Sequence, residues 1–281
     1  MSGDPTSCQL MSTRMQDMLA DARTRLRHEP TERRVRADLG GATVVDSTRA
    51  VLVWEPRRVV PSYAVPGDDI RAELVAAPAA DGDVPGVLHP GIPFRVHTAR
   101  GEPVTIGDRA GAGFRLDDLA GYVVLDFGAF DAWYEEDERI FGHPRDPFHR
   151  FDVRQTSRQV RVELGGEVVA ETTRARLLFE TGLMTRFYLP REDVRVALAP
   201  HPRRTYCPYK GRASYWSAEI AGRRHGGIGW SYEQPLPDAA PIAGLVAFWD
   251  ELVDVYVDGE LRERPGGPIA EAMRREFGLQ A

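Results

Sequence analysis

The same sequence pattern occurs twice in this chain, as RRVRADLGGATVVDSTRAVLVWE (33–55) and as RQVRVELGGEVVAETTRARLLFE (158–180). At a constant offset of 125 residues, twelve of the 23 aligned positions are identical. The match resumes between YAVPGDDIRAEL (63–74) and YLPREDVRVAL (188–198). It returns between LAGYVVLDFGAFDAWYEE (119–136) and IAGLVAFWDELVDVYVDG (242–259). Collinear matches of this kind indicate an internal duplication, so we predict two copies of one domain.

Each copy has the pattern of a β-rich domain. In VRVEL (160–164), apolar and charged residues alternate, which is the period of a half-buried strand. Gly165 and Gly166 follow, where a two-residue hairpin turn requires positive φ, and EVVAET (167–172) is the expected return strand. The apolar run GYVVLDF (121–127) is typical of an interior strand.

Helices are expected only near the two ends of the chain. Apolar residues at helical spacing predict an amphipathic helix over 10–27 that packs on the domains, and PIAEAMRREFGL predicts a second helix over 268–279. The predicted fold class is therefore mainly β, with two duplicated small β-rich domains and N- and C-terminal helices. The expected parts are an N-terminal helical extension (1–30), a degenerate first repeat (31–136), a linker (137–156), a second repeat (157–264) and a C-terminal helix (265–281).

Composition excludes several classes of protein. The 281 residues include 42% hydrophobic and 28% charged residues, as in soluble globular proteins. The net charge of −6, without a basic cluster, argues against nucleic acid as the partner. No apolar run is long enough for a membrane helix, and no signal peptide is visible. Two distant cysteines make no disulfide framework, so we expect a reduced, cytoplasmic protein. The oligomeric state does not follow from these features.

The copies differ most in the segment between their shared strand patterns. The second copy has TYCPYKGRASYWSAEIAGRRHGGIGWSYEQPLP (205–237), which contains the only lysine of the chain. The first copy has AADGDVPGVLHPGIPFRVHTARGEPVTIGDRAGAG (79–113), without Cys, Lys, Tyr or Trp. We therefore predict that the second repeat carries the functional pocket, formed by 205–217 and 228–237. The first repeat supplies only candidate wall residues, His89, Phe94 and His97.

These motifs identify a family resemblance. The chain resembles the tandem form of the DUF427 family, small β-rich bacterial domains of unknown function, through RFYLPREDV (186–194), TYCPYKGRASYWS (205–217), IGWSYEQPLP (228–237) and IAGLVAFWDELVDVYVDG (242–259). The resemblance covers 155–264 strongly and 33–136 more weakly. It implies a compact sheet fold similar to the β-tent group. The family has also been labelled a nucleotidyltransferase, yet the chain has no P-loop, no GxGxxG and no Gly-Ser followed by paired aspartates for metal-bound phosphoryl transfer.

Lys210 and Cys207 are the candidate catalytic residues. A lysine amine changes its protonation on burial and forms Schiff bases, which a guanidinium does not, so a single lysine among 35 arginines suggests that arginine fails at this position. The alternative is a structural lysine in a tight Lys-Gly turn. Cys207 is a candidate nucleophile if a neighbouring cation activates it. The alternative is a small buried apolar residue, which is the commoner role of a cysteine beside proline.

Aromatic residues and one arginine are the candidate ligand-binding residues. The aromatic side chains suit a cage around a flat or cationic ligand, although a small sheet also needs such residues in its core. We expect Tyr209 and Trp216 to lie nearest to a ligand. Arg186 is a candidate anchor for an anion because it has no arginine counterpart in the first copy, whereas Arg174 matches Arg49 and suggests a shared structural role. The candidates are Tyr209, Tyr215, Trp216, Trp230, Tyr232 and Arg186.

A metal and a cofactor are not expected. His143, Asp146 and His149 in the linker are weak candidate metal ligands, but two prolines separate them and one cysteine cannot build a zinc thiolate site. The sequence therefore favours the binding or processing of a small polar metabolite in the second repeat. The alternatives are a non-catalytic module that binds a small ligand or peptide, and a purely structural module. The sequence does not decide whether the protein is an enzyme.

Overall fold

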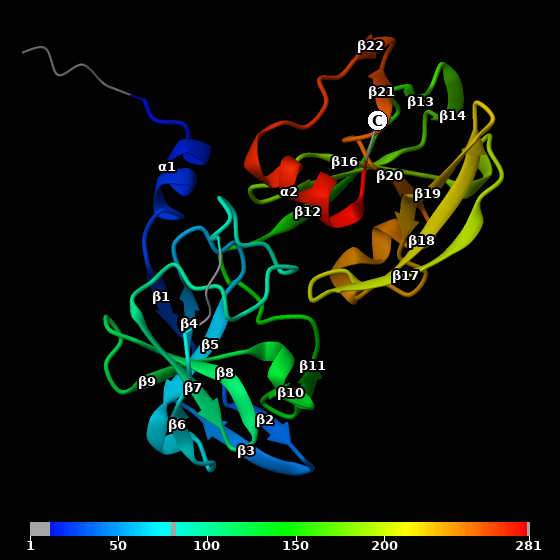
Figure 1. The fold of residues 1–281 in the computed structure, drawn as a ribbon. Helices are drawn as coiled ribbons and strands as arrows, with labels where there is room; N and C mark the ends of the chain where they lie inside the picture. The colour runs from blue at the N-terminus through cyan, green and yellow to red at the C-terminus, as the bar shows by residue number, and fades with distance from the viewer. Residues whose placement is uncertain (1–11, 80–82, 280–281) are drawn as a thin grey trace, which may run out of the picture.

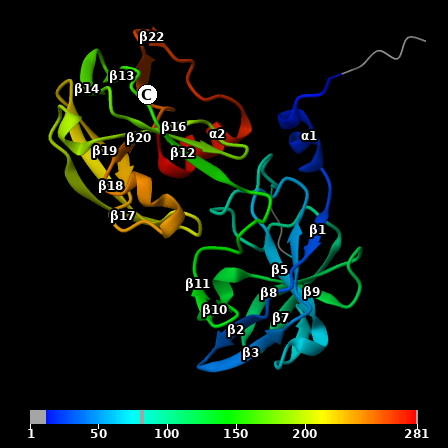
Figure 2. The ribbon, with the colours of Figure 1, turned by 180° about the vertical axis from the view of Figure 1, so that it is seen from behind.

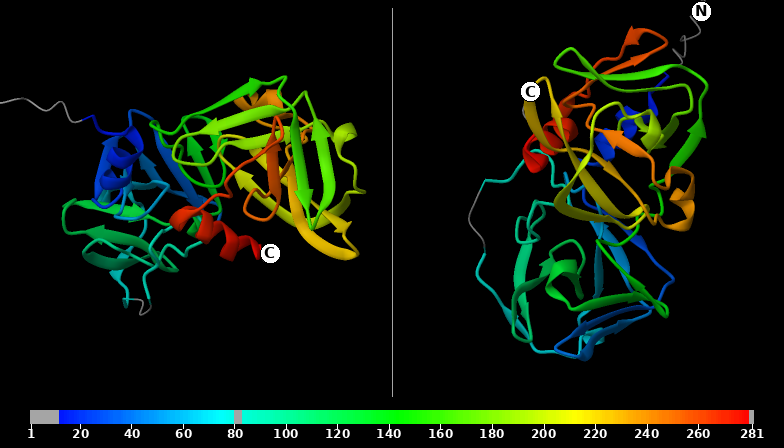
Figure 3. Two further views of the ribbon diagram at one scale, coloured as in Figure 1. Left: turned by 90° about the horizontal axis from the view of Figure 1, so that it is seen from above. Right: turned by 90° about the vertical axis from the view of Figure 1, so that its right-hand side faces the viewer.

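The two repeats form two lobes, as the computed structural model shows for residues 12–79 and 83–279 (Figure 1). The lobes remain distinct when the molecule is seen from behind (Figure 2) and from above or from the side (Figure 3). Helix α2 (Gly267–Phe277) lies near their junction, and α1 (Met15–Ala22) lies beside the first lobe. Within the described residues, neither helix is long and apolar enough to span a membrane.

Each repeat has one seven-stranded sheet, and the two sheets have the same strand order. In the first repeat the order is β1 (Arg27–Pro30), β4 (Val51–Trp54), β5 (Ser62–Pro66), β9 (Tyr122–Leu125), β8 (Arg109–Leu116), β7 (Gly101–Ile106) and β6 (Leu74–Ala76). In the second repeat it is β12 (Phe151–Gln155), β15 (Arg176–Glu180), β16 (Arg186–Leu189), β20 (Val246–Phe248), β19 (Arg223–Ser231), β18 (Gly211–Ile220) and β17 (Ala199–Cys207).

A four-stranded sheet completes each repeat. The first contains β11 (Glu138–Ile140), β10 (Ala132–Glu135), β2 (Val35–Leu39) and β3 (Ala42–Ser47) in that order. The second contains β22 (Glu260–Leu261), β21 (Asp254–Val257), β13 (Val160–Leu164) and β14 (Glu167–Thr172) in the equivalent order. Short 3₁₀ helices occupy Gly67–Asp69, Phe127–Ala129, Arg191–Asp193 and Pro237–Ile242. The prediction of a mainly β, duplicated fold is confirmed.

The predicted Gly-Gly hairpins occur in both repeats. Leu164 pairs with Glu167 around Gly165 and Gly166, whose φ values are 60° and 83°. The turn at Gly40–Gly41 between β2 and β3 has nearly the same angles, 61° and 80°. Residues with a Cβ seldom adopt positive φ at both turn positions, so these glycines define the hairpin register in each copy.

The core of each repeat lies between its two sheets. In the first repeat, Val35 and Ala37 of β2 pack in one cluster with Leu52 of β4 and Leu125 of β9. The second repeat packs Val160 and Val162 of β13 with strands of its larger sheet in the same way. The alternating burial of β2 and β13 is the period-two pattern that the sequence predicts for strands buried on one face.

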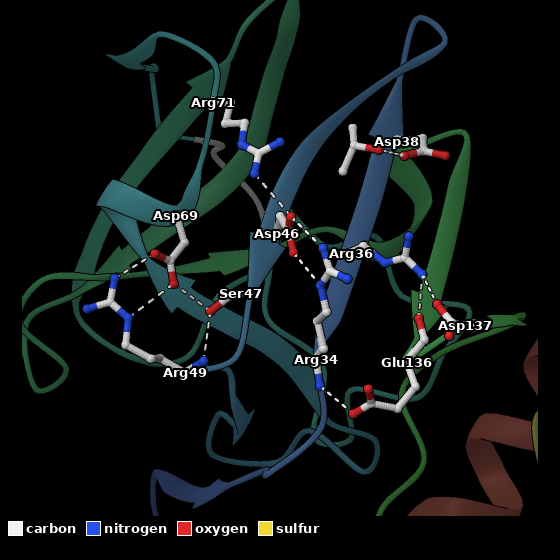
Figure 4. A network of polar contacts seen from close by, with 11 residues as sticks. Arg34, Arg36, Asp38, Asp46, Ser47, Arg49, Asp69, Arg71, Glu136 and Asp137 are labelled. Carbon is white, nitrogen blue, oxygen red and sulfur yellow. Dashed lines mark hydrogen bonds and ion pairs between the residues drawn. The ribbon is translucent and has the colours of Figure 1, made fainter.

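One polar cluster is repeated in both lobes, and Figure 4 shows the copy in the first lobe. In the first, Ser47 Oγ donates to Asp69 (2.6 Å) and Arg49 forms an ion pair with the same carboxylate. In the second, Thr172 Oγ1 donates to the carboxylate of Asp193 at 2.6 Å, and Arg174 forms an ion pair with the same carboxylate at 2.9 Å. The match gives Arg49 and Arg174 the same structural position.

The expected boundaries differ from the structure at two places. The N-terminal helix spans only Met15–Ala22, whereas 10–27 was expected, and it has no buried residue; residues 10 and 11 lie outside the described range. Residues from Arg27 onward instead form β1, because they pair with β4 at the sheet edge. Strands β11 and β12 both fall within the expected linker, so the segment between strands is 141–150. Helix α2 agrees closely with the expected 268–279.

Candidate functional site

A buried ion pair lies at one end of β15. Lys210 Nζ is 2.5 and 2.6 Å from the two carboxylate oxygens of Glu180, and His149 Nε2 is 2.9 Å from one of them. The side chains of Lys210 and Glu180 are only 9% and 7% exposed. Burial opposes ionisation of Glu180, but the ion pair with Lys210 and the hydrogen bond from His149 outweigh it and lower its pKa to about 2. The carboxylate is therefore charged and holds the lysine as its partner cation.

The hairpin between β17 and β18 positions Lys210. Cys207 pairs with Gly211, and the residues between them form the turn. Gly211 has φ of 96°, and a Cβ there would be 3.3 Å from the backbone nitrogen of Leu236. That nitrogen donates to the carbonyl of Lys210 at 3.1 Å. The Lys-Gly pair is thus a local requirement, because only glycine combines this backbone angle with so close a neighbour.

A cavity of about 700 Å³ surrounds this ion pair. Its walls come from the larger sheet of the second repeat, from α1 and α2, from segment 142–149, and from β1, β4 and residues 87–90 of the first repeat. The second-repeat wall is mainly aromatic, with a few polar groups. Its residues include Glu180, Arg186, Tyr188, Cys207, Tyr209, Lys210, Tyr215, Trp230, Tyr232 and Trp249. Helix α2 adds Met273 and Phe277.

Arg186 lines the cavity but already has protein partners. Its guanidinium donates two hydrogen bonds to Glu251, at 2.8 and 2.6 Å, and lies 3.3 Å from Asp250. It also lies 5.5 Å from the ring centres of both Trp230 and Trp249. The bidentate face is therefore used by Glu251, and Arg186 acts on the cavity mainly by holding the two indole rings.

The candidate aromatic residues divide between the two faces of the sheet. Tyr215, Trp230 and Tyr232 are buried and line the cavity. Trp216 is outside the cavity lining, because it follows Tyr215 in β18 and so points to the opposite face. There its indole nitrogen donates to Ser231 Oγ at 2.8 Å, and the guanidinium of Arg191 lies 3.9 Å from its ring centre.

Cys207 and Tyr209 belong to the same hairpin but have different surroundings. Cys207 is a half-buried free thiol that lines the cavity and makes no hydrogen bond with the described residues. Tyr209 holds segment 141–150, since its hydroxyl accepts from the backbone nitrogen of Asp146 at 2.6 Å. The ring of Tyr209 also lies against His149, with 4.7 Å between ring centres.

The three weak metal candidates have separate partners. His149 contacts Glu180, Asp146 accepts from the backbone of Phe148 at 2.7 Å, and His143 Nδ1 is 2.7 Å from the carbonyl of Pro144. Burial lowers the pKa of His143 to about 4. Among the described residues, no group of three His, Cys, Asp or Glu side chains is arranged to hold a metal ion.

The first repeat has a counterpart of Glu180, and a loop of the same repeat covers that counterpart. Glu55 follows β4 at the equivalent position and is 2% exposed. It accepts from the backbone nitrogens of Thr98 (2.8 Å) and Ala99 (3.1 Å) and lies 2.9 Å from His97 Nδ1. The loop before β7 thus occupies the position that Lys210 and His149 have in the second repeat.

The same loop fills the outer face of the first large sheet. Phe94 and Ala99 pack there against Val51, Val53 and Ala64. In the second repeat, Leu178 of β15 and Tyr188 of β16, which are equivalent to Val53 and Ala64, face the cavity instead. Of the three expected first-repeat wall residues, His89 lines the cavity, whereas Phe94 and His97 cover their own sheet.

Sequence reasoning missed Glu180, the central acceptor of the site. The duplication contained a signal, because both aligned segments end in glutamate, Glu55 and Glu180. The contributions of Tyr188, Trp249 and α2 left no comparable signal, since they depend on how distant segments meet.

The comparison with known families agrees with the division of the chain into two repeats. The family described as "Domain of unknown function (DUF427)" matches residues 27–82 and 152–259, which is more than half of the chain. The chain belongs to this family. The first matched segment begins with the β1 edge strand and the second within β12, so each DUF427 unit includes the edge strand that the expected boundaries placed elsewhere. The first match ends where the two repeats diverge. A search of curated proteins found no match.

Proposed function

We propose that this protein binds a small polar metabolite in the cavity around Lys210 and Cys207. The observation that carries the proposal is the combination of a cavity of about 700 Å³ with a charged, hydrogen-bonded group in its wall. Small-molecule sites usually have roughly this size, apolar and aromatic walls and a few convergent polar groups.

The residues have distinct roles in this proposal. Lys210, Glu180 and His149 form the polar end of the site and orient a polar group of the ligand. Tyr215, Trp230 and Tyr232 form the flat apolar wall, which suits a planar or ring-containing ligand.

Binding is better supported than covalent chemistry. Schiff-base formation needs an amine that can reach a carbonyl carbon, and the Lys210 amine is already engaged by both carboxylate oxygens of Glu180. A nucleophilic cysteine needs a base, and the thiol of Cys207 has no hydrogen-bond partner among the described residues.

Native mass spectrometry of the freshly purified full chain tests the proposal. We expect a non-covalent adduct of small mass that disappears on denaturation. Lys210→Met and Lys210→Arg should lose this adduct while they remain folded by circular dichroism. Arg212→Met is the matched control, because Arg212 is exposed in the same hairpin and lies outside the cavity lining. An adduct that both Lys210 variants retain, or no adduct together with no thermal stabilisation by a metabolite panel, would contradict the proposal.

A further inference from the structure

The first repeat contributes an arginine and a tryptophan to the same cavity. Arg27 of β1 and Trp54 of β4 are directly opposite each other in the strand pairing. The guanidinium of Arg27 lies 5.7 Å from the ring centre of Trp54, and both residues line the cavity. Neither side chain is among the hydrogen-bond partners of Glu55 described above.

Both side chains carry a buried N–H group without an acceptor. Arg27 Nε and Trp54 Nε1 are buried and have no hydrogen-bond partner among the described residues. Trp54 as a whole is only 3% exposed. An unpaired buried donor is costly, so such groups in native proteins usually meet a water or ligand acceptor. Two such donors on paired residues indicate a place for an acceptor.

Arg27 also lacks a counter-ion. Its Nη2 donates to the carbonyl of Arg58 at 3.1 Å, and it forms no ion pair with the described residues. Burial lowers its pKa, which the charge of Asp146 partly opposes. Glu29 lines the same cavity without an ion pair to Arg27. Across the cavity, Glu180 is occupied by Lys210 and Glu276 by His89 (2.8 Å).

We propose that Arg27 and Trp54 bind an anionic oxygen, of a carboxylate or a phosphate, on a ligand whose planar part lies against the aromatic wall of the second repeat. This inference rests on the proposed function and adds to it the chemical class of the ligand. It also makes the site a joint product of the two repeats. Arginine suits this role because its N–H groups form charge-assisted hydrogen bonds with carboxylate and phosphate oxygens.

Three probes of similar size test the proposal on the full chain. Benzoate and phenyl phosphate each carry an anionic group on a planar ring, and benzamide is the neutral counterpart of benzoate. Binding is measured by isothermal titration calorimetry at millimolar probe concentration. We expect at least one anion to bind roughly tenfold or more tightly than benzamide, because a charge-assisted hydrogen bond is stronger than a neutral one. The stronger of the two anions identifies the acidic group.

Variants locate the anion. Arg27→Gln should remove the preference for the anion, and Trp54→Phe should reduce it because it deletes the indole N–H and keeps an aromatic ring. Arg25→Gln is the matched control, with the same charge change at an exposed residue that pairs with Asp21. Thermal melting verifies that each variant is folded, and Trp54→Phe provides the test if Arg27→Gln does not fold.

The outcomes separate the two proposals. Equal binding of benzoate, phenyl phosphate and benzamide would overturn the anion assignment and leave the binding function in place. Anion binding that survives both Arg27→Gln and Trp54→Phe would also overturn the assignment. If none of the three probes binds, this inference fails, and the native mass spectrometry described above decides the proposed function separately.

Discussion

Lys210 and Glu180 form a close ion pair in which both carboxylate oxygens contact one amine, at 2.5 and 2.6 Å. The two residues lie in different hairpins of the same sheet and are 30 positions apart. Both side chains are almost fully buried, so neither charge has water as a substitute partner. This relationship decides how the site responds to substitution and to pH.

Removing one partner of this pair should be costly. We expect Glu180→Gln to lower the free energy of unfolding by roughly 3–5 kcal/mol, because it leaves the Lys210 ammonium buried without a counter-charge. The double variant Lys210→Met, Glu180→Gln should lose less than Glu180→Gln alone. Urea denaturation of the three proteins measures the effect. Equal losses in the single and double variants would show that the ion pair is not the cause.

Acid should remove the contribution of Glu180. Its pKa in the folded protein is about 2, below the ordinary glutamate value of 4.5, so the folded state binds the proton less readily than the unfolded state. The stabilisation is complete above about pH 4.5 and is lost as the pH falls toward 2, with a total of about 3 kcal/mol. Denaturation curves recorded from about pH 7 to about pH 3 measure how the free energy of unfolding falls with pH. Glu180→Gln should flatten this part of the profile.

Asp250 should have the opposite pH dependence. Burial, together with the charge of Glu251, raises its pKa to about 6 despite Arg186, so the folded state binds the proton more readily than the unfolded state. Stability should therefore fall as the pH rises from about 4 to about 6 on account of this residue. Asp250→Asn removes this titration, so the free energy of unfolding of the variant should rise relative to that of the wild type by roughly 2–3 kcal/mol over this range. An effect that does not change with pH would contradict the assignment.

Gly211 should not tolerate a side chain. Gly211→Ala places a Cβ at φ of 96° and 3.3 Å from the nitrogen of Leu236, so we expect a loss of roughly 1–3 kcal/mol and a displaced Lys210. Gly226→Ala in β19 is the control, because Gly226 has no positive φ and its nearest contact would be an ordinary 3.7 Å. Comparable losses in the two variants would show that the turn geometry is not limiting.

The repeated Asp69 and Asp193 clusters should contribute equally in the two lobes. We expect Asp69→Ala and Asp193→Ala each to cost about 1–2 kcal/mol, mainly from the lost hydrogen bond of Ser47 or Thr172. The exposed arginine pairs add little. Thermal melting at low and high salt separates these terms. Strong salt dependence would show that the ion pairs matter more than the hydrogen bonds.

Much of the fold was predictable because its signals are local. The Gly-Gly turns and the alternating strands depend on neighbouring residues, and both occur in each lobe. The internal repeat is visible in the sequence itself. Lys210 and the turn that presents it could be found for the same reason. The edge strands β1, β11 and β12 could not, because they lie at the edges of their sheets and become strands only by pairing with one neighbour.

The sequence by itself thus determined the duplication, the β-rich architecture and the segment around Lys210. Only the tertiary structure decided that Glu180 is the partner of Lys210 and that Trp216 points away from the cavity. It also decided that Arg27 and Trp54 of the first repeat face the same cavity as Lys210. The physical reason is that strand patterns depend on residues one or two positions apart. A cavity wall depends on side chains that meet only after two sheets, a connecting segment and a terminal helix have packed together.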